Sequence, residues 1–170
     1  MTSTGQHPAS VDMDTFRAVM GSLPSGVCVV TSVDDEGRPQ GLTCSAVCSV
    51  SGDPPMLLAC VKAPSRTLDA ILARKRFAVN FLDADAQAVS ALFASPVEDK
   101  FGTVAWDDAS GMPQLRAAVA TAQLIVHDTV QAGDHVIVLG RMVEGEAHRN
   151  RFPLGYWRGS YVRVFRIARA

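Results

Sequence analysis

The stretch Gly41–Val61 constrains the fold more than any other part of the chain. It contains two strand-like apolar runs, Ala46–Val50 and Met56–Val61, joined by the turn residues Ser-Gly-Asp-Pro-Pro. A core strand would carry Val, Ile or Phe ahead of the first run, but the chain has four small residues there: Thr43, Cys44, Ser45 and Ala46. Small side chains allow another group to approach the backbone closely. The stretch predicts antiparallel strands with either a bound group or a closely packed neighbour at these residues.

The rest of the chain is also rich in β-type patterns. Helices are expected at residues 12–23, after Ser65 as N-cap, and from Asp83 onward. The regular spacing of apolar residues is lost over residues 95–113, which are expected to form a long loop. Further strands are expected at residues 26–33, 77–82, 118–131, 135–147 and 160–168. About seven strands without regular βαβ alternation predict a mainly β fold, an antiparallel barrel with peripheral helices.

Length and charge narrow the class of protein. A chain of 170 residues with 48% hydrophobic content is expected to form one domain, over residues 12–170, after a flexible tail at residues 1–11. The formal net charge of −1 argues against a nucleic acid partner. No apolar run approaches a membrane span, and the polar start lacks the pattern of a signal peptide. A cytoplasmic location with no membrane partner is therefore expected.

The motifs that usually carry chemistry are missing. The sequence has no Gly-x-Gly-x-x-Gly after a strand, no phosphate-binding Gly-Lys loop and no Gly-x-Ser-x-Gly elbow. Its four cysteines all lie in apolar runs, which favours buried, reduced thiols, and no cysteine–histidine spacing predicts a metal site. If the protein is an enzyme, a cofactor is expected to carry the chemistry.

The order of several weaker motifs is more specific. They are Gly26-Val-x-Val-Val-Thr31, Gly41-x-Thr-x-Ser-Ala46, Ser49-Val-Ser51 before Pro54-Pro55, Ser65-Arg-Thr67, Phe77-Ala-Val-Asn-Phe81 and Gly133-Asp-His135. Their order and spacing over residues 12–168 resemble the short-chain flavin reductases, the reductase components of two-component flavin-dependent monooxygenases.

That resemblance implies both a fold and a function. The fold is the FMN-binding split β-barrel, antiparallel and Greek-key-like, assembled as a homodimer with flavin near the subunit interface. The function is an NAD(P)H:flavin oxidoreductase that reduces FMN or FAD and releases reduced flavin to a partner monooxygenase. The sequence has no motif for the 2′-phosphate of NADPH, which gives a slight preference for NADH.

Eleven residues are expected to bind the flavin. The small stretch would bring backbone N–H groups to the polar edge of the ring. Ser65, Arg66 and Thr67, at a helix N-terminus, would bind the phosphate, although an ordinary Ser cap explains the same pattern. Lys100 would add charge or be a solvated loop residue. The full set is Thr43, Cys44, Ser45, Ala46, Cys60, Val61, Ser65, Arg66, Thr67, Lys100 and Phe101.

Three residues are expected on the nicotinamide side. The family has a histidine after the Gly-Asp hairpin, so His135 is expected to bind nicotinamide, although a surface residue is an alternative. Tyr156 and Trp157 resemble the segment that closes over the nicotinamide, or they fill the barrel end. No residue is expected to act as an acid or base, because direct hydride transfer depends on stacking.

Two other functions remain open at this point. A non-catalytic split-barrel protein that binds flavin or haem would have the same fold. An enzyme similar to pyridoxamine-phosphate oxidase would hold FMN tightly and oxidise an amine. The family often has Ala or Met near positions 44 and 48, where this chain has Cys44 and Cys48, so the role of these thiols is unresolved.

Overall fold

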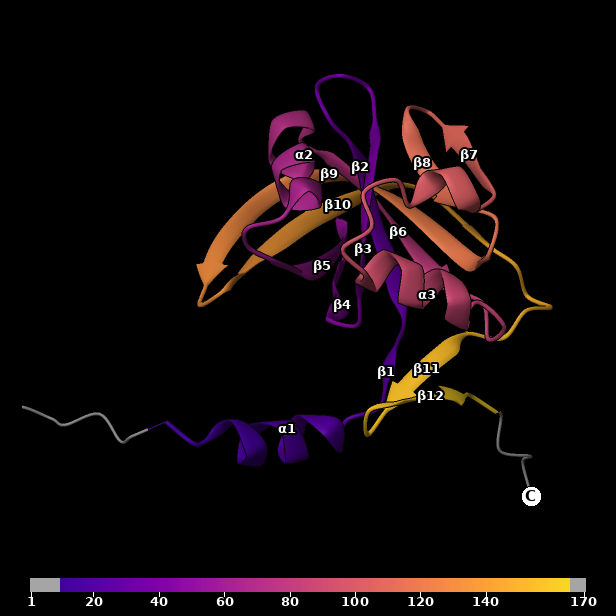
Figure 1. Ribbon diagram of the computed structural model, residues 1–170. Helices are drawn as coiled ribbons and strands as arrows, with labels where there is room; N and C mark the ends of the chain where they lie inside the picture. The colour runs from indigo at the N-terminus through magenta and orange to yellow at the C-terminus, as the bar shows by residue number, and fades with distance from the viewer. Residues whose placement is uncertain (1–9, 166–170) are drawn as a thin grey trace, which may run out of the picture.

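A seven-stranded antiparallel sheet dominates the fold (Figure 1). The computed structural model describes residues 10–165. The strands of the sheet lie in the order β3 (Pro39–Cys44), β2 (Cys28–Val33), β6 (Arg76–Leu82), β9 (Ala118–Ala132), β10 (His135–Ala147), β5 (Pro55–Lys62) and β4 (Val47–Gly52). The order is not sequential, and the predicted antiparallel, mainly β architecture is confirmed.

The sheet closes into a barrel at the small-residue stretch. β3 and β4 are the two edges of the sheet, yet only Ser45 and Ala46 separate them in the chain. The three peptide units from Cys44 to Val47 span at most about 11 Å. Beside this link the amide of Cys60, on β5, donates to the carbonyl of Ala46 at 2.9 Å. The small residues ahead of the expected run Ala46–Val50 therefore join two strands that belong to opposite edges.

Two hydrophobic cores lie on the two faces of β2. Alternate side chains of this strand point to opposite faces. Cys28 and Val30 belong to the barrel interior, which is filled by residues such as Phe77, whereas Val27 and Val29 belong to a second core outside the barrel. Burial on both faces explains why β2 begins with three consecutive apolar residues, Cys28, Val29 and Val30.

Helices α2 (Arg66–Arg74) and α3 (Gln87–Ala94) pack against the barrel. The Ser65 side chain accepts from the amide of Leu68 at 3.2 Å, so the predicted N-cap is confirmed. α3 begins at Gln87 rather than at Asp83, because Asp83 accepts from the amide of Asp85 and forms a turn before the helix.

The expected loop over residues 95–113 is largely structured. It holds a short 3-10 helix, η1 (Phe101–Thr103), and a hairpin formed with β7 (Trp106–Ala109) and β8 (Met112–Leu115). Ser110 and Gly111 connect these strands with φ angles of 54° and 80°, as a two-residue hairpin turn requires. The hairpin is fixed to the barrel by Asn80, which accepts from the amide of Leu115 at 2.8 Å. The prediction of a long loop was wrong because this turn was not recognised.

A second small sheet lies beside the barrel, formed by β1 (Ser25–Gly26), β11 (Leu154–Trp157) and β12 (Ser160–Arg163). β11 was not predicted. β12 ends at Arg163, before the expected end at Ala168, and residues 166–168 lie outside the described residues. The expected tail at residues 1–11 also lies outside them, except for its last two residues.

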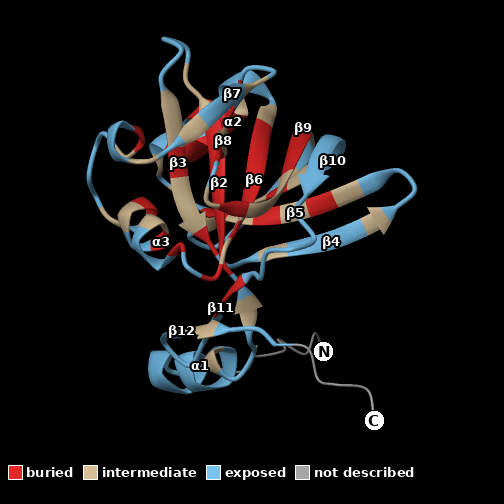
Figure 2. Ribbon diagram, turned by 90° about the vertical axis from the view of Figure 1, so that its right-hand side faces the viewer, coloured by how far each residue is buried: buried red, intermediate tan, exposed pale blue. Residues whose placement is uncertain are grey.

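The predicted first helix is present as α1 (Met13–Gly21), and it has no buried residue. Figure 2 shows it exposed below the barrel, next to β11 and β12. Its apolar side chains, which include Phe16, Val19 and Met20, are 47–65% exposed. No helix within residues 10–165 is both long and apolar enough to cross a membrane.

Candidate functional site

A large groove of about 1350 Å³ lies between α1, the β4–β5 hairpin and the turn between β11 and β12. Its floor includes the link that closes the barrel. Ser45 and Ala46 are exposed there, and Cys60 lies beside them on β5. The floor is formed by small side chains because the chain must cross from one sheet edge to the other at this point. A flat ligand can approach the backbone closely here.

Aromatic side chains form the far wall of this groove. Tyr156 and Trp157 line it at the end of β11, with 38% and 40% of their surface exposed. Tyr156 packs edge-to-face on Tyr161, with ring centroids 5.5 Å apart. The indole nitrogen of Trp157 donates to the carbonyl of Ser22 at 3.4 Å. The wall is therefore tied both to β12 and to the end of α1.

A second, smaller cavity of about 320 Å³ brings together the residues expected at the phosphate. Its lining includes Ser65, Arg66, Thr67, Lys100 and Phe101. Free backbone amides and a guanidinium at the N-terminus of α2 make this cavity suitable for an anion. Within residues 10–165, the one ion pair of Arg66 is with Glu98, which also lines this cavity, at 3.7 Å, and the Glu98 side chain is 89% exposed. We refer to this cavity as the anion pocket.

Lys100 has a more structural position than expected. Its ammonium donates to the carbonyls of Phe93 and Gly41, at 2.9 and 3.3 Å. Partial burial lowers the pKa of Lys100, and the nearby positive charge of Arg66 lowers it further. Two cations that repel each other at one cavity would gain from a bound anion. Lys100 is thus not the solvated loop residue of the alternative interpretation.

Phe101 contributes mainly to packing. It is buried and makes edge-to-face contacts with Phe93 and Trp106, with ring centroids 5.0 and 5.5 Å away. A Cβ on Gly41 would lie only 2.7 Å from the Phe93 ring. The aromatic cluster therefore requires glycine on β3 and holds the wall of the anion pocket in place.

The groove and the anion pocket lie along one segment of the chain. Leu42 lines the pocket and Ser45 lines the groove. These residues are three apart, about 10 Å in an extended strand. A ligand with a ring at one end and a phosphate at the other can reach both. A 620 Å³ cleft on the other side of Arg66 is lined by six carboxylates and is unsuited to an anion.

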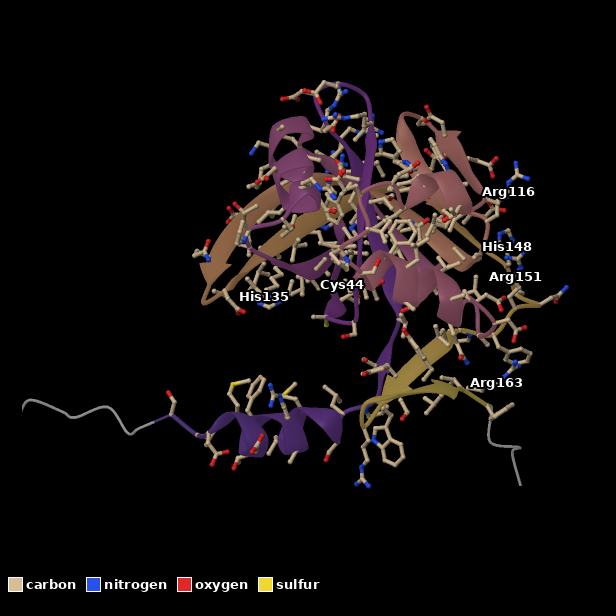
Figure 3. All side chains as sticks on the ribbon, viewed as in Figure 1. Cys44, Arg116, His135, His148, Arg151 and Arg163 are labelled. Carbon is tan, nitrogen blue, oxygen red and sulfur yellow. The ribbon has the colours of Figure 1, made fainter. Side chains whose placement is uncertain are left out.

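Four of the expected residues do not line either cavity. Thr43 donates its hydroxyl to the carbonyl of Ser90 on α3, at 2.7 Å. Cys44 is 6% exposed and Val61 is fully buried in the barrel core, so neither presents its side chain to a ligand. Figure 3 shows His135 at the tip of the β9–β10 hairpin.

The ring nitrogen Nδ1 of His135 lies 2.8 Å from the carboxylate of Asp134, and the histidine side chain is 41% exposed. Within one subunit His135 lines neither the groove nor the anion pocket, so it does not occupy the expected position beside the flavin. Its position matches the alternative of a surface hairpin residue.

The four cysteines do not share one environment, contrary to the expectation of uniform burial. Cys28 and Cys44 are buried, Cys60 is half-buried and Cys48 is exposed in the groove. Burial raises the pKa of the Cys28 thiol to about 12, with a smaller contribution from Cys44. Burial also raises the pKa of Cys44. The two buried thiols are therefore neutral packing groups.

Sequence reasoning missed part of the groove. Phe16 and Arg17 on α1, Cys48 on β4 and Arg158 in the β11–β12 turn all line it. The apolar period of residues 12–23 predicted a helix, but periodicity does not show that its apolar face lines a groove. An available signal was the Arg158-Gly159 pair directly after two aromatic residues.

Known proteins resemble this chain along most of its length. Residues 20–164 match the family described as Flavin reductase like domain. A flavin reductase (NADH) of Kitasatospora aureofaciens is 49% identical over 160 residues, covering 92% of this chain and 84% of that protein. The reductase component of a 4-nitrophenol 4-monooxygenase/4-nitrocatechol 2-monooxygenase of Rhodococcus opacus is 37% identical, covering 89% and 80%.

A solved structure is also similar. The NADH:FAD oxidoreductase of Streptomyces globisporus C-1027, in complex with NAD and FAD fragments, matches with a TM-score of 0.85 at 32% identity. The match covers 91% of this chain and 93% of that one.

Proposed function

Because the chain belongs to the flavin reductase family, we propose that it is an NAD(P)H:flavin oxidoreductase that reduces FMN or FAD by hydride transfer. The reduced flavin then passes to a partner monooxygenase, as the similarity to a monooxygenase reductase component suggests. The observation that carries the proposal is the match to the family over residues 20–164. Together with the groove, it favours an enzyme over a binding protein.

The residues present fit a flavin. The exposed link Ser45–Ala46 offers small side chains where an isoalloxazine ring needs backbone donors. The anion pocket, with Ser65 and Arg66, fits a phosphate one strand segment away. We propose that Ser45, Ala46 and Cys60 lie at the ring and that the anion pocket holds the phosphate. The groove floor is then supported by residues that do not touch the ligand, namely Thr43, Cys44 and Val61.

The chain's own residues bind and orient, and do not move protons. When bound, the flavin supplies the hydride acceptor for the C4 hydride of the reduced nicotinamide. Tyr156 and Trp157 provide an apolar wall that limits water and would direct the nicotinamide toward the flavin ring. Backbone amides of the link stabilise negative charge near the floor. Arg66 and Lys100 hold the phosphate, which fixes the orientation of the ring.

We propose a homodimer as the working form. Outside the groove, α1 presents apolar side chains to solvent, with Met13 58% and Val19 65% exposed. Exposed apolar faces of this kind usually mark an interface. A second subunit would cover this face, and its His135 would supply the histidine expected on the nicotinamide side. A cytoplasmic location, where NAD(P)H is supplied, follows from the proposed reaction.

The test is NAD(P)H oxidation as a function of added flavin. A reductase oxidises NADH or NADPH at a rate that saturates with FMN or FAD and is negligible without flavin. A protein that quenches flavin fluorescence but leaves NAD(P)H unchanged would be a binding protein, and the proposal would be rejected. Oxygen uptake that requires an amine and no NAD(P)H would instead identify an amine oxidase.

A further inference from the structure

The charges around the large groove are all of one sign. Arg17 on α1 and Arg158 in the β11–β12 turn are the two ionised side chains among its lining residues, which include no carboxylate. Arg116, on another part of the surface, is by contrast paired with an acid, Asp107, at 2.7 Å. An apolar groove with two guanidiniums and aromatic walls suits a ligand that is both aromatic and anionic.

Arg158 occupies a backbone conformation that its residue type disfavours. Arg158 and Gly159 have φ angles of 48° and 80° and form the two-residue turn between Trp157 and Ser160. Turns of this kind favour Asn-Gly, because both central residues need a positive φ. Turn chemistry therefore does not explain an arginine here. A residue that breaks a local preference in this way indicates a functional reason for its side chain.

The surrounding contacts fix the Arg158 side chain at the groove. Its amide donates to the carbonyl of Gly21 at 3.2 Å, which joins the turn to the end of α1. Its guanidinium lies 4.6 Å from the ring centroid of Trp157. Stacking on an indole limits the freedom of the guanidinium and leaves its N–H edge available.

Arg17 enters the same groove from the helix. Its one ionic contact among the described residues is with Asp14, at 3.5 Å between side chains that are 70% and 96% exposed. Such an exposed pair is weak. Because α1 ends at the Arg158 turn, the two guanidiniums lie on adjoining walls of one groove.

We propose that Arg17 and Arg158 bind the pyrophosphate of the reduced nicotinamide dinucleotide. This inference rests on the proposed function. The nicotinamide would lie over the flavin ring at Ala46, on the side of Trp157, and the pyrophosphate would extend toward the two arginines. The two residues are positioning and specificity residues: they hold the dinucleotide and do not touch the transferred hydride.

The flavin phosphate is the other anion that the groove could receive. The anion pocket at Arg66 already offers a better site, with a helix N-terminus and a second cation at Lys100. The dinucleotide is therefore assigned to the groove, and the experiment separates the two sources.

The experiment compares Arg17→Ala, Arg158→Asn and the double variant with wild type. Arg158→Asn creates the favoured Asn-Gly turn, so the fold is kept. KM is measured for NADH, FMN and riboflavin, and the dissociation constant of ADP-ribose is measured by calorimetry. N-benzyl-dihydronicotinamide, a hydride donor without phosphates, serves as the comparison substrate. Arg149→Ala is the matched control, because Arg149 is exposed and outside the groove.

We expect KM for NADH and the dissociation constant of ADP-ribose to rise about tenfold for each arginine removed. KM for FMN and riboflavin, and the rate with the phosphate-free donor, should stay near wild type. An unchanged KM for NADH in a folded variant overturns the inference while the reductase function stands. A rise in KM for FMN instead overturns it in favour of a flavin phosphate in the groove. If the wild-type protein fails to reduce flavin with NADH and also with the phosphate-free donor, the proposed function itself is overturned.

Discussion

The thiol of Cys44 donates to the carbonyl oxygen of Cys60 at 3.4 Å, directly behind the floor of the groove. This contact joins the end of β3 to β5, at the place where Ser45 and Ala46 carry the chain from one sheet edge to the other. The shape of the floor therefore depends on a residue that no ligand touches.

Removing this thiol should destabilise the barrel. Cys44→Ala loses a hydrogen bond and leaves a small gap in the core, which should cost about 1–2 kcal/mol. The free energy of unfolding from urea denaturation is the measurement. Cys48→Ala is the control: this exposed cysteine should change stability by less than about 0.5 kcal/mol. Equal effects of the two substitutions would contradict a structural role for Cys44.

The buried thiol of Cys28 should make stability fall in alkaline solution. Its pKa is raised by burial to about 12 from an ordinary 9.0. In the unfolded chain the thiol ionises near pH 9, whereas in the folded protein it stays protonated, so the contribution is complete below pH 9 and is lost as the pH rises toward 12. Between pH 8 and pH 10, wild type should lose about 1.4 kcal/mol more than Cys28→Ala. Parallel pH profiles would show that Cys28 ionises normally.

The anion pocket should distinguish FMN from riboflavin, which lacks the phosphate. Arg66→Ala removes the guanidinium and should raise KM for FMN about tenfold, equal to 1.4 kcal/mol of binding. KM for riboflavin should not change. Arg74→Ala, at the opposite end of α2, is the matched control. If Arg66→Ala weakens both flavins equally, the pocket does not bind the phosphate.

The fold could be predicted from sequence where local patterns decide it. The strands near Phe77 and His135 and the cap at Ser65 follow from β propensity and capping chemistry, and the structure has them at these places. The separation of β3 from β4 could not be predicted, because the partner of each strand is set by contacts distant in sequence. The surroundings of α1 could not be predicted either, since periodicity identifies an apolar face but not what covers it.

The candidate site follows in outline from the family resemblance and stays a prediction. Small residues and the helix N-terminus at Arg66 are local features, and they line the groove and the anion pocket. Val61 was misassigned because a one-residue step along a strand changes which face a side chain occupies. Arg17 and Arg158 were missed because only the fold brings α1 next to the β11–β12 turn.

The most direct test of the account is anaerobic bleaching of FMN by NADH, in wild type and in Ala46→Trp. Ala46 is exposed on the groove floor, so the indole should fill the ring site without unfolding the barrel. Wild type should bleach FMN rapidly, and Ala46→Trp should be slower by about tenfold or more, the effect of losing 1.4 kcal/mol of binding. Ala132→Trp, exposed at the β9–β10 hairpin, should match wild type. If Ala46→Trp bleaches FMN as fast as wild type, the flavin does not bind on this floor and the account is contradicted.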